Sequence, residues 1–161
     1  YTSQVAYNEF YPRGIEPVEP NITALLNPKD VKWKKLLTPG IAVPTPWEKE
    51  ELDRFDLAYQ KTRQELNEKI ARMKREGAPV EEIAKLEIES EKLSLEQGKK
   101  VEEFLAKSKY AGKVGVFEGA GYASTGLYRP AVDCIMFTKG KKPYCPVCLE
   151  AVKEMIEFYA N

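Results

Sequence analysis

The cysteines are the residues of this sequence whose type and spacing could most directly do chemistry. Cys145 and Cys148 form a Cys-Pro-Val-Cys motif, and Cys134 lies upstream of it. Pro146 suits the first turn of a helix, where the helix dipole and free backbone N–H groups lower a thiol pKa. Thioredoxin-like oxidoreductases use this arrangement, but too little chain follows Cys148 for the further strands and helix of that fold. The sequence therefore disfavours redox catalysis.

An odd number of cysteines leaves at least one thiol unless it pairs with another chain. One disulfide from Cys134 to Cys145 or to Cys148 is compatible with an exported protein, and the spacing does not choose between these partners. A structural zinc ion needs a fourth ligand, yet the chain has no histidine, and Asp133 is awkwardly placed beside Cys134. The sequence thus favours a disulfide or buried thiols over zinc, and it predicts no metal bound by this chain alone.

The composition excludes several other classes of function. Without histidine the chain cannot provide a histidine-ligated metal, a histidine general base or a histidine-based triad. Its 25 basic and 25 acidic residues balance, so no net field favours nucleic acid or an anionic membrane. Apolar residues make up 43% and charged residues 31%, as is typical of a folded globular protein. No apolar run approaches the roughly 18 residues that a membrane span needs.

A glycine-rich stretch supplies the remaining candidates. The glycines between residues 119 and 126 do not form a phosphate-binding loop, because no Lys-Ser or Lys-Thr pair and no helix start follows them. Tyr122, Tyr128 and Arg129 are more informative, since a phenol or a guanidinium on a rigid loop can hold a substrate carbonyl or stabilise developing negative charge. The alternative is that these side chains pack in a core around an internal salt bridge.

Residues 1–46 are predicted to be rich in loops. Seven prolines fall here, and each removes a backbone donor and restricts the residue before it. Asn27-Pro28 and Thr38-Pro39-Gly40 are typical of turns. Short helical turns are expected at residues 21–26 and 30–37.

Residues 47–109 are predicted to form an antiparallel helical hairpin. Apolar residues recur at heptad spacing in both halves, and the Gly77-Ala78-Pro79 break turns the chain back. The stripe comprises Leu52, Phe55, Tyr59, Leu66, Ile70, Met73, Ile83, Leu86, Leu93, Val101 and Phe104. Each arm has about 27 residues and so spans roughly 40 Å. The hairpin either contacts a partner or substrate or is a structural insertion with a solvated charged face, and we favour the insertion.

Residues 110–161 are predicted to return to irregular structure, with a short strand at 113–117 and a turn at 118–121. A final helix should start at Pro146 and dock on a core through an apolar stripe. The stripe comprises Cys148, Val152, Met155 and Tyr159. The expected fold class is therefore mainly α with irregular, loop-rich segments, and α+β at most.

Residues 115–136, which read GVFEGAGYASTGLYRPAVDCIM, carry a family resemblance together with YCPVC at 144–148 and the C-terminal helix. This combination resembles the C-terminal part of the IgA-peptidase-type zinc metallopeptidases, which are metzincin-like. EPNIT at 19–23 and VKWKKLL at 31–37 resemble the stretch that follows the active-site helix of those enzymes. The resemblance covers both loop-rich regions, and it implies that the helical hairpin is an insertion in a metzincin-like subdomain.

The resemblance implies a role for Met136. Metzincin-like enzymes place a methionine-containing tight turn beneath the catalytic zinc, as a hydrophobic floor under the ligating histidines. A polarisable thioether packs well there without competing as a ligand. Residues 127–130 would then form a wall of the substrate cleft. The implied substrate-binding candidates are Gly126, Leu127, Tyr128, Arg129 and Tyr122.

The HExxH helix of that family, with two histidine ligands and the glutamate that activates zinc-bound water, is not in this sequence. The chain is therefore expected to hold no catalytic residue and to be inert alone, as the C-terminal portion of a zinc-dependent metalloendopeptidase whose N-terminal remainder completes the site. The opening Tyr1-Thr2-Ser3-Gln4, without an initiator methionine or signal-peptide features, also favours a fragment. The intact enzyme is expected to bind zinc, to be secreted or periplasmic, and to cleave peptides or proteins.

Two other functions stay open from the sequence. A non-enzymatic binding module would act through the helical hairpin, so that deleting the hairpin abolishes partner binding. A degenerate peptidase homologue would have kept the fold and lost the metal, so that the full-length product carries no catalytic zinc.

Overall fold

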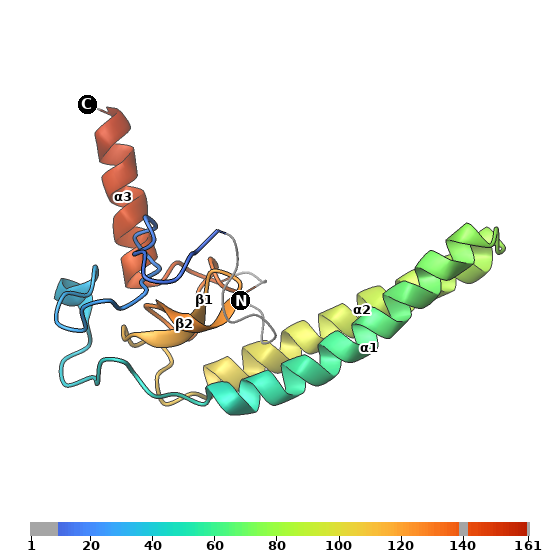
Figure 1. Cartoon of the computed structure of the whole chain (residues 1–161), viewed down its shortest axis with the longest axis horizontal. Helices are drawn as coiled ribbons and strands as arrows, with labels where there is room; N and C mark the ends of the chain where they lie inside the picture. The colour runs from blue at the N-terminus through green and yellow to red at the C-terminus, as the bar shows by residue number, and fades with distance from the viewer. Residues whose placement is uncertain (1–9, 139–141, 161) are drawn as a thin grey trace. The chain divides into compact units, whose positions relative to one another are not determined.

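Three α-helices, a short 3-10 helix and a two-stranded sheet make up the part of the chain that the structure describes, residues 10–138 and 142–160 (Figure 1). In this computed structural model the elements are η1 (Lys34–Leu36), α1 (Lys49–Arg75), α2 (Val80–Ala106), β1 (Phe117–Ala120), β2 (Ala123–Arg129) and α3 (Pro146–Ala160). The prediction of a mainly α fold with a little β structure is confirmed. No helix in the described ranges combines the length and apolar character needed to cross a membrane.

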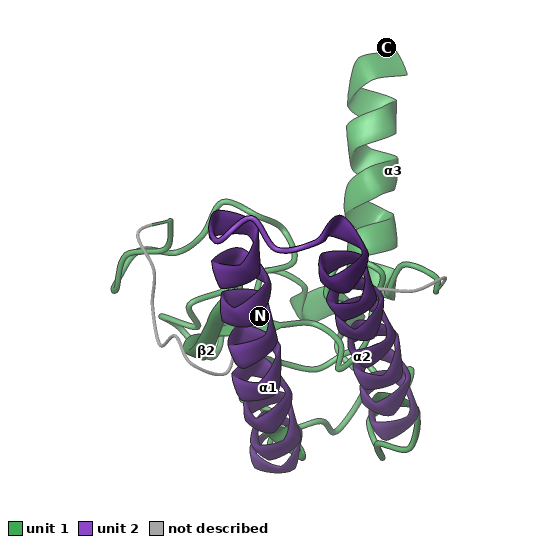
Figure 2. Cartoon of the chain, turned by 90° about the vertical axis from the view of Figure 1, so that its right-hand side faces the viewer, with its two compact units in different colours: residues 1–49, 105–161 green, residues 50–104 purple. Residues whose placement is uncertain are grey.

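The chain divides into two compact units (Figure 2). One consists of Tyr1–Lys49 and Leu105–Asn161 and contains the sheet and α3. The other is Glu50–Phe104 and contains nearly all of α1 and α2. The loop-rich regions at the two ends of the sequence therefore fold together into one unit.

Within the second unit, α1 and α2 pack against each other as an antiparallel hairpin. The rings of Phe55 and Phe104 make an edge contact at 5.3 Å, and near the connecting turn Lys74 Nζ lies 2.7 Å from Glu87 Oε1. Every residue of the predicted heptad stripe is buried or half-buried, whereas most of the other residues of both helices are exposed. Heptad spacing thus predicted both the hairpin and its packed face.

The sheet unit contains a β-hairpin whose turn consists of Gly121 and Tyr122, with φ of 55° and 62°. Positive φ at both central residues is what a type I′ turn requires, and its twist matches that of the strands. The strand expected at 113–117 begins only at Phe117, and the turn expected at 118–121 lies further along the chain. The alternation of buried and exposed residues that is typical of strands is interrupted at two places. A register shift lies between Glu118 and Ala120, and β2 begins with two successive buried residues.

The N-terminal loop region pairs with β2 and does not form the helical turn expected at residues 21–26. Thr23 and Tyr128 exchange two backbone hydrogen bonds, of 2.9 and 3.1 Å. Leu25 then adopts a φ of 53°, which excludes a right-handed helix there. The second expected helical turn, at 30–37, forms only as the short helix η1. Backbone pairing with a neighbouring strand therefore replaces the local helix.

Two groups of buried side chains form the core of this unit. The larger group comprises Val31, Trp33, Val114, Val116, Ala131, Cys134, Cys145, Val147 and Cys148. The smaller group comprises Ile22, Ala120, Ala123 and Leu127. The indole N–H of Trp33 donates to the carbonyl of Gly115 at 2.7 Å, so the largest core side chain has its polar atom satisfied. The core thus joins the N-terminal loops, the sheet and the start of α3.

Helix α3 contacts this core through its first turn. Val147 and Cys148 are buried, but every residue from Lys153 to Ala160 is exposed. The helix was expected to dock on a core through its apolar stripe, and beyond Val152 the stripe is not covered. Met155 and Tyr159, the last two members of the stripe, are exposed together with Phe158. The end of α3 therefore exposes several large apolar side chains together, which is unusual for a surface helix.

Candidate functional site

Met136 lies in a tight turn that follows the sheet. The backbone N–H groups of Phe137 and Thr138 both donate to the carbonyl of Cys134, at 2.9 and 3.1 Å. Met136 is thus in the middle of a hydrogen-bonded turn, and its side chain is 57% exposed. The next residue, Phe137, packs against the core, so the turn exposes the side chain of Met136 beside a partly buried neighbour.

Two hollows meet at Met136. The first has a volume of about 230 Å³, and the second, which runs toward α3, has a volume of about 410 Å³. Glu19, Asn21 and Met136 line both of them. The first is completed by Tyr11, Ile22, Ala120, Gly121, Tyr122, Arg129 and Phe137, and the second by Pro20, Tyr144, Cys148, Ala151, Val152 and Met155. Met136 therefore forms part of the floor of an open, mostly apolar depression.

A tyrosine and a carboxylate on the wall of the first hollow are hydrogen-bonded to each other. The hydroxyl of Tyr11 donates to Glu19 Oε1 at 2.8 Å, while Glu19 Oε2 is buried and has no hydrogen-bond partner among the described residues. Burial, and then the bond to Glu19, raises the pKa of Tyr11 to about 12. Gly121 has no side chain at this point, and a Cβ there would meet the Tyr11 ring at 2.7 Å. A glycine at this turn therefore lets the tyrosine close one side of the hollow.

Replacing Glu19 by glutamine should lower the pKa of Tyr11 from about 12 toward its ordinary value of 10.0, because the negative charge that opposes ionisation is lost. The pKa should stay above the ordinary value, since burial is the largest cause of the shift. The contribution of Tyr11 to folding stability is therefore fully present below pH 10.0 and is lost as the pH rises through about 12. Ultraviolet titration of tyrosinate, with Tyr11→Phe as the subtraction, measures this pKa.

Glu16→Gln is the matched control for that titration. Glu16 Oε2 accepts a hydrogen bond from the backbone N–H of Ala24, and Glu16 pairs with Lys32, not with the tyrosine. The control should leave the pKa of Tyr11 unchanged. An unchanged pKa in Glu19→Gln would show that the bond between Tyr11 and Glu19 does not form in solution.

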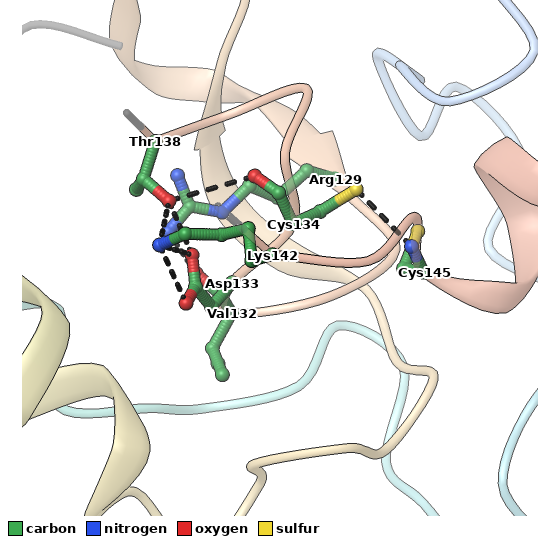
Figure 3. A network of polar contacts seen from close by, with 7 residues as sticks. All are labelled: Arg129, Val132, Asp133, Cys134, Thr138, Lys142 and Cys145. Atoms are coloured by element: carbon green, nitrogen blue, oxygen red, sulfur yellow. Dashed lines mark hydrogen bonds and ion pairs between the residues drawn. The ribbon is translucent and has the colours of Figure 1, made fainter. Parts of the chain in front are cut away.

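Arg129 lines the first hollow, although the residue is only 1% exposed. Its guanidinium stacks between two aromatic rings, 5.0 Å from the centroid of Trp47 and 5.5 Å from that of Phe137. It also donates to the carbonyl of Val132 at 3.0 Å (Figure 3). Because Phe137 belongs to the Met136 turn, this guanidinium holds the turn against the sheet.

The other predicted substrate-binding residues differ in their access to solvent. Leu127 is a core residue of the smaller cluster, and Tyr128 is half-buried against the larger one. Gly126 is half-buried and its N–H donates to Glu118 Oε1 at 3.0 Å. Tyr122 is the exposed one, at 68%, and it lines the first hollow. Of the five candidates, Tyr122 alone combines an exposed side chain with a place in a hollow.

Sequence reasoning missed Tyr11, Glu19 and Asn21 as site residues. They lie far from Met136 in the sequence and reach it because the N-terminal loop pairs with β2. The one available signal was the EPNIT segment, which contains Glu19 and Asn21 and carried part of the family resemblance.

An ion pair joins Lys142 to Asp133, the residue before Cys134. Lys142 Nζ lies 3.0 Å from each carboxylate oxygen of Asp133 and 2.8 Å from the hydroxyl of Thr138, which itself donates to Asp133 (Figure 3). In this view the carboxylate of Asp133 and the sulfur of Cys134 point to opposite sides. Asp133 is therefore a structural partner of Lys142.

The three cysteines come together beneath the same turn. Their Sγ atoms all lie within 4.8 Å of one another, and the three thiols are free in the structure. Hydrogen bonds from the Cys145 and Cys148 thiols lower the pKa of Cys134, whereas the same contacts raise the pKa of both donors. The structure brings together the whole set that was proposed for a disulfide, and the pairing itself stays a prediction.

The residues around Met136 do not by themselves form a catalytic zinc site. Such a site usually takes three protein ligands, most often histidines with or without a carboxylate. Among the described residues, Glu19 is the single carboxylate that lines the two hollows, and the sequence contains no histidine. A catalytic zinc at this position would therefore need ligands from outside these 161 residues.

Comparison with known proteins identifies the family of the chain. The family model described as IgA Peptidase M64 matches residues 1–156. The chain belongs to the IgA peptidase M64 family. Peptidases of this family are in general zinc-dependent and act on protein substrates, and the match confirms the resemblance seen in the sequence. No curated protein matches the chain.

Proposed function

We propose that this M64 chain is the C-terminal portion of a zinc-dependent metalloendopeptidase, inert alone, which provides the methionine turn and one wall of the substrate cleft. The observation that carries the proposal is the position of Met136, which is exposed in the middle of a hydrogen-bonded turn and lines two adjoining hollows. An N-terminal remainder of the same protein would fit over these hollows and bring the ligands of the metal.

Four residues of the depression have a role in this proposal. The thioether of Met136 forms an apolar floor, and the stacked guanidinium of Arg129 keeps that floor in place. Glu19 Oε2 is a buried acceptor that can hold an N–H group of the incoming segment. Tyr122 is exposed at the rim and can hydrogen-bond a bound peptide. Zinc, when bound, would supply the activated water that hydrolyses the peptide bond.

The intact protein should cleave peptides, and a zinc chelator should abolish the cleavage. Incubation of the full-length gene product with a mixed peptide library, followed by mass spectrometry of the products, measures both effects. The enzyme is proposed to act outside the cytoplasm, so the library should include peptides from extracellular proteins. A degenerate homologue, in contrast, would leave every peptide intact with or without added zinc.

Deleting residues 50–104 separates the peptidase from a binding module that acts through the hairpin. The hairpin is a compact unit of its own, and its outer faces are largely exposed. The intact enzyme with a short glycine linker between Lys49 and Leu105 should retain peptide cleavage within about tenfold, since the deleted residues line neither hollow. If a deletion variant that folds no longer cleaves peptides, the result would support a function that depends on the hairpin.

A further inference from the structure

Three cysteine sulfurs converge at one buried point beneath the Met136 turn. The Sγ atoms of Cys134, Cys145 and Cys148 lie within 4.8 Å of one another, and the residues are 2%, 7% and 4% exposed. Tetrahedral zinc with Zn–S bonds of about 2.3 Å holds its sulfur ligands roughly 3.8 Å apart, so small side-chain adjustments bring all three into ligand positions. We propose that Cys134, Cys145 and Cys148 bind a structural zinc ion, distinct from any catalytic one.

The local structure favours thiolate ligands at this point. Cys145 immediately precedes α3, Pro146–Ala160, and Cys148 is the third residue of that helix. Both residues therefore lie at the positive end of the helix dipole. The backbone N–H of Cys145 donates to Cys134 Sγ at 3.2 Å (Figure 3). Donors of this kind stabilise and orient metal-bound sulfurs.

Asn21 is the fourth ligand in this proposal. Asp133, the neighbour of Cys134, is held by Lys142 at 3.0 Å and so does not serve. The amide of Asn21 already touches Cys148 Sγ, and a half-turn about its Cβ–Cγ bond would present Oδ1 in place of Nδ2. The sequence has no histidine to serve as the fourth zinc ligand, and Asn21 takes that position in this proposal.

A zinc ion accounts for all three sulfurs, whereas a disulfide uses two and leaves the third as a buried thiol. Soft thiolate ligands select zinc over magnesium or calcium. Each thiol that binds gives its proton to solvent, so the site needs no oxidant or reductant. The ion would also tie α3, which the core holds only by its first turn, to the turn that carries Met136. The zinc is thus proposed to fix the position of both elements.

Metal analysis of the intact protein, purified under reducing conditions, tests this site. Cys134→Ser, Cys145→Ser and Cys148→Ser should each lower the zinc content by about one ion per chain relative to the unaltered protein. Val147→Ala is the matched control, because Val147 is equally buried in the same turn of α3 but offers no ligand. Its zinc content should be unchanged.

Cobalt(II) titration of the unaltered protein gives a second result that does not depend on whether a serine variant folds. Bound cobalt should produce the near-ultraviolet thiolate-to-cobalt charge-transfer band, which a catalytic site without cysteines cannot produce. Absence of this band, or peptide mapping that finds a disulfide from Cys134 to Cys145 or Cys148 in the purified protein, would overturn the proposal. Peptide cleavage is not measured in either experiment, so failure of this site is distinguishable from failure of the proposed function.

Discussion

Replacing Met136 by alanine in the intact peptidase should lower kcat/KM for peptide cleavage by about 10- to 100-fold, the usual range for residues that support a metal site without binding the ion. The stability of the protein should change little, because the side chain is 57% exposed and its removal leaves no buried cavity. Met136→Leu restores an apolar floor of similar volume and should lose less activity. Peptide cleavage kinetics and urea denaturation of the same samples measure the two effects.

Ile135→Ala is the control for this substitution. Ile135 occupies the same turn and is also partly exposed, yet it does not line either hollow. The activity of the Ile135→Ala variant should remain close to that of the unaltered enzyme. Equal losses in both variants would mean that the turn tolerates no change, and that Met136 has no particular place beneath a reacting centre.

Replacing Arg129 by alanine should lower the free energy of unfolding by about 3 kcal/mol, through a large cavity, a lost buried hydrogen bond and two lost ring contacts. The guanidinium is 5.0 Å from Trp47, 5.5 Å from Phe137 and 3.0 Å from the carbonyl of Val132. Arg129→Lys keeps the charge but not the planar group, so it should recover part of the loss. Urea denaturation of the chain measures each difference.

An exposed arginine provides the comparison for that loss. Arg63 lies on the exposed face of α1, and its replacement by alanine should change stability by less than about 0.5 kcal/mol. If Arg129→Ala were equally mild, a substrate contact for Arg129, which the family resemblance implied, would be supported. A large loss instead assigns it to holding the Met136 turn.

The helical hairpin was readable from sequence because its determinants are local. Heptad spacing and a Gly-Pro break act within a few turns of helix, so the stripe from Leu52 to Phe104 could be assigned residue by residue. The β-hairpin was misplaced because its alternation is interrupted. Arg129 occupies a buried position in β2, and the turn depends on a left-handed Tyr122, a residue type that does not signal positive φ.

The candidate site was only partly readable, for a related reason. Met136 was singled out through the family resemblance. It lies in a hydrogen-bonded turn, and its role beneath a metal site stays a prediction. Tyr11 and Glu19 reach it only through the pairing of Thr23 with Tyr128, which is a tertiary contact between distant segments. The Cys145–Cys148 spacing is local to α3, but the approach of Cys134 to that pair depends on the fold.

The exposed end of α3 was not predicted either, because the burial of a helix depends on contacts with distant segments. Its apolar stripe correctly predicted a helix, yet periodicity shows which face is apolar and not what covers it. In the described chain the core covers only Val147 and Cys148 on that helix. Met155 is exposed and lines the larger hollow together with Met136. The proposed N-terminal remainder would cover both methionines.

We propose that Met136 lies beneath a metal site whose ligands come from polypeptide preceding Tyr1. The sequence of the encoding gene upstream of Tyr1 can be read to test this. We expect an in-frame HExxH motif within the preceding few dozen codons. A stop codon there, or an open reading frame without that motif, would contradict it.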